Sequence, residues 1–300
     1  MNENTAATNV VRHDAESVAA TFPALLVEAR RVAQTVSSGL HGRKRAGPGE
    51  TFWQHRPYAF GDPVSIIDWR QSARIADRLY VRENEWEIAA AVYLWRDPSR
   101  SLDFSSSKDT PTKRRRADVL ATALSILLSE AGERIGLLGE ERRLFHGRNA
   151  PMRLLEALHI GDFENENAPP GAVHLQAGAS VVLMSDFYTE ESEITSAVIN
   201  YASQGANGVL LQLCDFAEEE FPFEGRTQFL DPEGSDKLIF GETVKLAKNY
   251  HSAFAAHRDA LRNIAEKAGW TFISHRTDKP PQTALLALYN ALADARSWNI

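Results

Sequence analysis

Three oxygen-bearing side chains stand on alternate positions where an apolar run gives way to a polar loop. In "WRDPSRSLDF" they are Asp97, Ser99 and Ser101. One carboxylate and two hydroxyls at this spacing can turn toward a single point, and hard oxygen ligands of this kind suit Mg²⁺ or Mn²⁺. An Asp–Pro–Ser turn closed by its own Asx hydrogen bonds would explain the same residues without an ion. The spacing therefore predicts either a cation site or a tight turn.

Two further aspartates follow apolar runs in the same way. Asp186 comes after "VVLMS" and Asp215 after "LLQLC". In an open sheet of parallel strands, ligands bind in the crevice at the carboxyl ends of the strands, so we expect the three carboxylates to lie along one edge. A purely structural role is open to Asp186 as well, as the cap of the helix expected to start near Thr189.

The elements that must position these aspartates alternate along the chain. Apolar runs typical of buried strands lie at residues 88–95, 179–185, 207–214 and 270–275. Helical spacing of apolar residues marks segments 117–132, 151–158, 190–205, 243–269 and 282–295. Residues 134–147 read as a hairpin. Strands buried on both faces that alternate with helices predict an α/β fold with a doubly wound, mostly parallel, Rossmann-like sheet.

Composition divides the chain into three expected segments. Residues 1–38 combine a polar tail with an amphipathic helix from about residue 15 to 36. Residues 39–87 begin with the Gly- and Pro-containing break "SSGLHGRKRAGPGE" and continue rich in aromatic and turn residues, which predicts a small β-rich segment. Residues 88–300 hold the α/β domain.

The β-rich segment contains an unusual cluster of arginine, aspartate and tryptophan. In "RPYAFGDPVSIIDWRQSAR" its members are Arg56, Asp62, Asp68, Trp69, Arg70 and Arg74. Arginine pairs bidentately with carboxylates and stacks on aromatic rings. The cluster therefore either binds the acidic tail of a partner protein or forms an internal salt-bridge network.

A second basic run, "KRRR" at residues 113–116, stands at the start of an expected helix. Positive charge there opposes the helix macrodipole. Either an anionic ligand or acidic partner compensates this charge, or the run is a frayed and solvated helix end.

Composition excludes several classes of function. The net charge of −7 argues against nucleic-acid binding, and the single Cys214 excludes an internal disulfide and cysteine-rich zinc sites. No apolar stretch approaches the ~20 residues of a membrane span, and the polar N-terminus lacks a secretory signal, so a cytoplasmic protein is expected. No nucleophile–base pair or phosphate loop is visible, so no enzymatic activity is expected.

The ordered motifs resemble those of a known family. "DPSRSL", with "LMSDFY" one crossover later, resembles the metal-ion-dependent adhesion site of von Willebrand factor type A (vWA) domains. "RPYAFGDPVSIIDWRQSAR" resembles the signature of the bacterial domain-of-unknown-function 58 family, a branch of the vWA-like superfamily. "QLCDFAEEEFPFEG", "LDPEG" and "RTDKPP" resemble its C-terminal pattern in the same order. The similarity runs from about Gly39 to the C-terminus.

The resemblance implies a site, a partner and a role. Asp97, Ser99 and Ser101 would hold Mg²⁺ (or Mn²⁺), Asp186 would reach the ion, and an acidic loop of a client protein would fill one open coordination position. A MoxR-type AAA+ ATPase would be the partner in a chaperone-like role. The superfamily also expects a threonine on a second loop, and none lies between "RRLFHG" and "ASVVLMSD". Either Asn149, Asn165 or Asn167 supplies that oxygen instead, or the site is incomplete.

Two functions of different classes follow. The leading interpretation is a non-enzymatic vWA-like protein-binding module that works with the ATPase in the assembly or maturation of a protein complex. Any Mg²⁺ dependence would come from its partial metal-ion-dependent adhesion site. The alternative is a Mg²⁺-dependent hydrolase in which Asp97 and Asp186 hold the metal.

Overall fold

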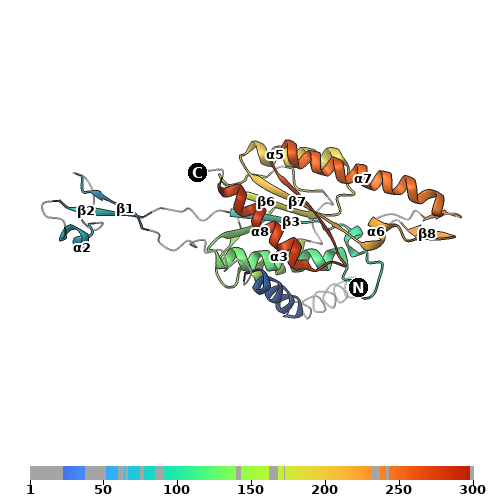
Figure 1. Ribbon diagram of the computed structural model, residues 1–300, viewed down its shortest axis with the longest axis horizontal. Helices are drawn as coiled ribbons and strands as arrows, with labels where there is room; N and C mark the ends of the chain where they lie inside the picture. Colours follow the sequence, from blue (N-terminus) through green and yellow to red (C-terminus); the bar gives the residue numbers. More distant parts are fainter. Residues whose placement is uncertain are drawn as a thin grey trace, which may run out of the picture. The chain divides into compact units, whose positions relative to one another are not determined.

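The computed structural model is built around a six-stranded sheet in the order β10-β7-β6-β3-β4-β5 (Figure 1). Every neighbouring pair is parallel except β4 and β5, which are antiparallel. The strands are β3 (Ala91–Arg96), β4 (Arg134–Leu137), β5 (Leu144–Phe145), β6 (Ser180–Ser185), β7 (Asn207–Cys214) and β10 (Thr271–Arg276). The first of these strands in the chain, β3, lies in the middle of the sheet. Strands β4 and β5 are added on one side of it, and β6, β7 and β10 are then added on the other side, which is a doubly wound topology. The predicted fold class is confirmed.

The structure describes most of the chain, in two compact units. The described residues are 23–37, 52–59, 64, 67–74, 78–84, 91–139, 143–161, 168–171, 173–230, 237–240 and 243–297. One unit consists of Arg43–Ala89, and the other of Met1–Gly42 together with Ala90–Ile300. The larger unit contains the sheet.

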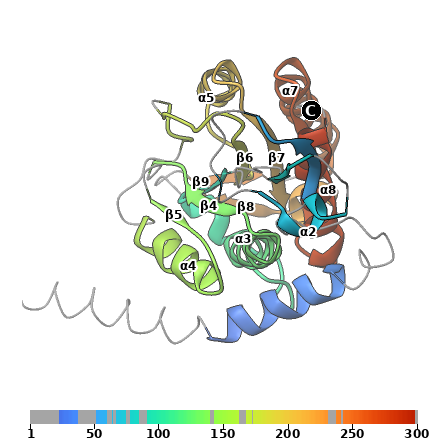
Figure 2. The same cartoon turned by 90° about the vertical axis from the view of Figure 1, so that its left-hand side faces the viewer.

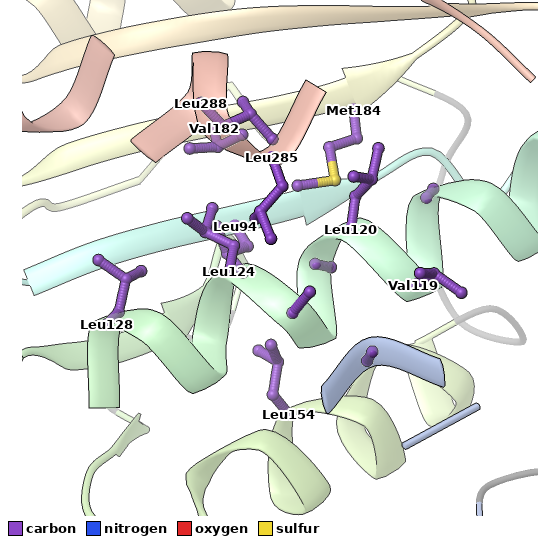
Figure 3. Close-up of a cluster of buried hydrophobic side chains, with 14 of the residues drawn as sticks. Leu94, Val119, Leu120, Leu124, Leu128, Leu154, Val182, Met184, Leu285 and Leu288 are labelled. Carbon is purple, nitrogen blue, oxygen red and sulfur yellow. The ribbon is translucent and has the colours of Figure 1, made fainter. Parts of the chain in front are cut away.

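One face of the sheet packs against α3 (Lys113–Glu130), α4 (Ala150–Gly161) and α8 (Pro281–Ser297), as Figure 2 shows. These helices meet β3 and β6 in a core of leucine, valine and methionine (Figure 3). The helical residues 23–37 join the same core through Leu25, Ala29 and Val32. The N-terminal helix predicted from the sequence is thus part of the larger unit, and its expected first residues, 15–22, lie outside the described part.

The opposite face is covered by α5 (Glu191–Ser203) and α7 (Thr243–Lys267) (Figure 2). Close packing here depends on one glycine: a Cβ at Gly208 would lie 2.4 Å from the ring of Trp270. The Trp270 indole N–H donates to the Ala206 carbonyl at 3.0 Å, which holds the ring in place. Strand β7 therefore tolerates no side chain at this position.

Three elements were not predicted from the sequence. They are helix α6 (Phe216–Glu220) and the two strands of a hairpin, β8 (Thr227–Leu230) and β9 (Lys237–Phe240), and they lie between the predicted strand at 207–214 and the predicted helix at 243–269. Their packing is aromatic: the Phe221 ring stacks on Phe229 and lies 4.4 Å from that of Tyr250, centroid to centroid. Helix α3 also begins four residues earlier than expected, at Lys113.

The smaller unit pairs β1 (Phe52–Pro57) with β2 (Tyr80–Asn84) in an antiparallel ladder. Helix α2 (Trp69–Ser72) lies between them in the chain, and the Asp68 carboxylate caps it by accepting the Gln71 N–H at 2.9 Å. The segment is β-rich, as expected. In the described parts of both units, every helix is too short or too polar to cross a bilayer.

The buried His275 of β10 predicts acid sensitivity. Burial, with the Arg116 charge beside it, lowers the pKa of this imidazole to about 4. In the unfolded chain the imidazole of His275 binds a proton as the pH falls below about 6.5, whereas in the folded chain it stays neutral until about pH 4. Protonation therefore favours the unfolded chain, and we expect it to lower the free energy of unfolding by about 3 kcal/mol between pH 6.5 and pH 4.

Urea denaturation from pH 7 to pH 4 measures this cost. The slope of the unfolding free energy with pH should flatten in His275→Gln and stay unchanged in His146→Gln, whose parent side chain is exposed. Equal slopes in all three proteins would show that His275 is not the responsible group.

Candidate functional site

The carboxyl ends of β3, β6 and β7 lie at one edge of the sheet, which we call the carboxyl edge. It includes the switch point between β3 and β6, where ligands bind in sheets of this class. Directly after β3, the Asp97 carboxylate accepts the Ser99 N–H at 2.8 Å, which is an Asx turn. The Ser99 and Ser101 hydroxyls lie 2.8 Å apart. The structure thus brings the three predicted loop residues together, and the loop is closed by hydrogen bonds of its own.

Ser185, which directly precedes Asp186 and was not singled out from the sequence, connects strand β6 to the Asp97 loop. Ser185, the last residue of β6, donates its hydroxyl proton to Asp97 Oδ2 and accepts the Phe187 N–H at 2.7 Å. Phe187 has a φ of 61°, a left-handed conformation that is uncommon for a bulky residue. Burial raises the pKa of the Asp97 carboxyl, although the hydrogen bond from Ser185 acts in the opposite direction.

Lys113 contributes the charge that dominates this edge. Its ammonium lies 2.7 Å from Asp186 Oδ2 and 2.5 Å from Glu218 Oε1 on α6, and its side chain is only 1% exposed. Burial alone would lower the pKa of Lys113, but the two carboxylates outweigh it and raise that pKa. A buried and charged lysine of this kind requires pairing, since an unpaired one would discharge or unfold the site.

The three arginines that follow bind three other segments. Arg114 pairs with Asp103 and donates to the Ser99 carbonyl at 2.9 Å. Arg115 reaches Glu28 at 2.7 Å on the N-terminal helix, and Arg116 donates to the Thr277 carbonyl at 2.6 Å, just after β10. The basic run is therefore neither a solvated end nor an open anion site: it joins the loops of the carboxyl edge to the start of α3.

The third predicted carboxylate, Asp215, caps a helix. It accepts the Ala217 N–H at 2.8 Å, while Glu218 accepts the Asp215 N–H at 2.7 Å, so that the two form a capping box at the start of α6. Glu218 was not identified from the sequence, although "CDFAEE" carries the spacing of a capping box. Its second oxygen holds Lys113, which connects α6 to α3.

Two charged residues of the site, Arg96 and Asp186, have partners that the structure shows. Arg96, directly before Asp97, is buried and pairs with Asp118 of α3 at 2.9 Å, so its charge is neutralised by that pair. Asp186 does not cap α5, because the helix begins at Glu191 with Glu190 as its N-cap residue; its Oδ1 instead accepts the Tyr188 N–H at 3.3 Å.

As the structure holds them, these side chains do not fit a divalent cation. The Lys113 ammonium already occupies Asp186 Oδ2, and a divalent ion on the same carboxylate would repel it by several kcal/mol. Both Asp97 oxygens already accept hydrogen bonds. These contacts disfavour the Mg²⁺ (or Mn²⁺) site expected from the sequence, and metal binding itself stays a prediction.

The oxygen expected from a second loop is not supplied by Asn149. This exposed residue precedes α4 and follows β5, and β5 runs antiparallel to its neighbour, which carries the chain back toward the opposite edge of the sheet. Asn165 and Asn167 lie outside the described residues.

The predicted partner-binding cluster of the smaller unit is described in part. Trp69 is 60% exposed, and Arg70 and Arg74 are exposed as well. Arg56 lies in β1 opposite Val81, and Asp62 lies outside the described residues. Partner binding by this cluster stays a prediction.

Cys214, at the end of β7, is buried, and burial raises the pKa of its thiol to about 11. This agrees with an inert core thiol.

Comparisons with known proteins place the chain among bacterial relatives. The model of a family described as a protein of unknown function, DUF58, matches residues 54–260. Uncharacterized proteins of Mycobacterium bovis and Mycobacterium tuberculosis are each 26% identical over 275 residues, covering 83% of this chain and 82% of theirs.

Two solved structures are also similar. An aerotolerance-related membrane protein of Bacteroides fragilis has a TM-score of 0.44 at 14% identity. The conserved hypothetical protein BatB of Bacteroides thetaiotaomicron has a TM-score of 0.41 at 12% identity. Each similarity covers 69% of this chain and 100% of the other.

The pairing of Lys113 with Asp186 predicts strong energetic coupling. Because either single change leaves a buried charge unpaired, Lys113→Met and Asp186→Asn should each lower the free energy of unfolding, by about 3–5 kcal/mol for a buried pair. The double variant should cost less than the sum of the two, by about 0.5–3 kcal/mol.

Urea denaturation of the four proteins gives this coupling energy. The exposed pair Arg262–Asp259, joined at 2.5 Å, is the matched control, and its cycle of Arg262→Met and Asp259→Asn should yield about 0.5 kcal/mol or less. A coupling energy for Lys113 and Asp186 as small as that of the control would contradict the buried ion pair.

Proposed function

Because the chain belongs to the DUF58 family of proteins of unknown function, we propose that it is a vWA-like protein-binding module without enzymatic activity of its own. In this proposal the module works with a MoxR-type AAA+ ATPase in the assembly or maturation of a protein complex. The resemblance of its ordered motifs to those of the family supports this choice of partner.

The observation that carries the proposal is an aromatic rim at the carboxyl edge, consisting of Phe104, Tyr188 and Phe216. The three residues follow β3, β6 and β7, and they are 40%, 49% and 39% exposed. The Phe104 and Tyr188 ring centroids lie 5.8 Å and 5.4 Å from the Lys113 ammonium, which orients both rings. Partly exposed aromatic side chains on a rigid support are typical of protein-binding surfaces.

The same geometry disfavours the alternative, a Mg²⁺-dependent hydrolase. Asp97 and Asp186 are only 1% and 2% exposed. A general base must come within hydrogen-bond reach of its substrate, and both carboxylates are instead covered and bonded to Ser185 and Lys113. Such buried carboxylates suit a structural role better than catalysis.

A client protein would present an acidic loop. The exposed Arg70 on α2 and the exposed Arg74 just after this helix supply charges that pair with carboxylates, and the exposed Trp69 of α2 supplies an aromatic ring. The smaller unit is thus the proposed surface for an acidic client segment.

Binding to the purified ATPase encoded in the same genome tests the proposal. We expect the double substitution Phe104→Ser/Tyr188→Ser to weaken the complex at least about tenfold, since two aromatic anchors would be lost. The matched control is Ile199→Ser on α5, which removes a 60% exposed apolar side chain elsewhere and should leave the dissociation constant unchanged. Biolayer interferometry measures both.

Three results would contradict the proposal. The first is an affinity for the ATPase that the double substitution leaves as unchanged as the control does, and the second is no binding to the ATPase at all. The third is Mg²⁺-dependent hydrolysis of a generic phosphate or carboxylic ester that disappears in both Asp97→Asn and Asp186→Asn, which would favour the hydrolase.

A further inference from the structure

We propose that the Lys113 ammonium takes the place of a divalent cation at the carboxyl edge, so that this chain assembles the edge without a metal. The inference concerns the chain's own residues and does not depend on the identity of a partner. It rests on how the ammonium is coordinated, how it is fixed, and how the neighbouring loop is closed.

The first observation is that the ammonium is fully coordinated. Asp186 and Glu218 accept from it at 2.7 Å and 2.5 Å. The Phe104 and Tyr188 rings cover it further, at 5.8 Å and 5.4 Å from their centroids. Two anionic oxygens and two ring faces satisfy a lysine with three N–H donors. The positive charge required by a buried carboxylate is therefore already present.

The second observation is that the ammonium cannot easily leave. Lys113 is the first residue of α3, whose start is capped by the Thr112 hydroxyl. The next residues, Arg114 and Arg116, bind the Ser99 and Thr277 carbonyls. Because these contacts lie on both sides of the helix end, they hold its first turn in place. If a metal ion displaced the ammonium, Lys113 would stay buried without its carboxylate partners, or the first turn of α3 would have to move.

The third observation is that the Asp97 loop keeps its shape without an ion. The Ser99 and Ser101 hydroxyls bond each other, and the Asp97 carboxylate is held by the Ser185 hydroxyl and the Ser99 N–H. These are protein contacts for the same side chains that would otherwise turn toward a metal. It follows that no open coordination position awaits a partner's carboxylate, and that a partner would meet the edge through its exposed side chains.

Titration of the wild-type protein is the first test. Isothermal titration calorimetry with MgCl₂ and with MnCl₂ should show no saturable binding, and the melting temperature should be the same in EDTA as in MgCl₂ at matched ionic strength. Saturable binding by the wild type that Asp97→Asn or Asp186→Asn abolishes would overturn the proposal.

The second test removes the ammonium. In Lys113→Met, Asp186 and Glu218 lose their counter-charge, so MgCl₂ should raise the melting temperature of this variant and leave the wild type unchanged. Lys108→Met, which removes an exposed lysine from the preceding loop, is the matched control and should behave as the wild type. A folded Lys113→Met protein that is as insensitive to MgCl₂ as the wild type would overturn the proposal. If Lys113→Met does not fold, the wild-type titration decides.

Discussion

The ammonium of Lys113 is shielded from water, and it can stay charged there only because two carboxylates face it. One of them, Asp186, follows the central strand β6, and the other, Glu218, belongs to α6. A buried charge without such partners costs far more free energy than an exposed one. The start of α3, the end of β6 and the capping box of α6 must therefore form together, and the carboxyl edge of the sheet is fixed by this requirement.

The rest of the edge is arranged around this constraint. The arginines after Lys113 bind the Asp97 loop, the N-terminal helix and the segment after β10, so they connect the start of α3 to three separate parts of the chain. Ser185 then joins the Asp97 loop to β6. A doubly wound sheet normally leaves a crevice at this point for a ligand. Here buried charged side chains lie at this point, and the partly exposed side chains that follow the three strands are aromatic, which is the basis for proposing a protein partner at this edge.

The sequence allowed much of this fold to be predicted, because its strands are apolar runs and its helices have regular apolar spacing. The strands β3, β6 and β7 and the turn at Asp97 follow directly from those local patterns. Lys113 could not be assigned from the sequence, because its partners lie 73 and 105 residues away and a basic run at a helix start reads as solvated. The β8–β9 hairpin was missed for a similar reason: Phe221, which stacks on Phe229 of β8, also packs on Tyr250, which belongs to α7 and comes much later in the chain.

The most direct measurement is a crystal structure of the wild-type protein grown in MnCl₂, with an anomalous difference map at the carboxyl edge. The account predicts no manganese peak beside Asp186, and Lys113 Nζ within hydrogen-bond distance of Asp186 and Glu218. A manganese peak between Ser99, Ser101 and Asp186, with the Lys113 side chain turned away, would contradict the claim that the lysine supplies the cation of this edge.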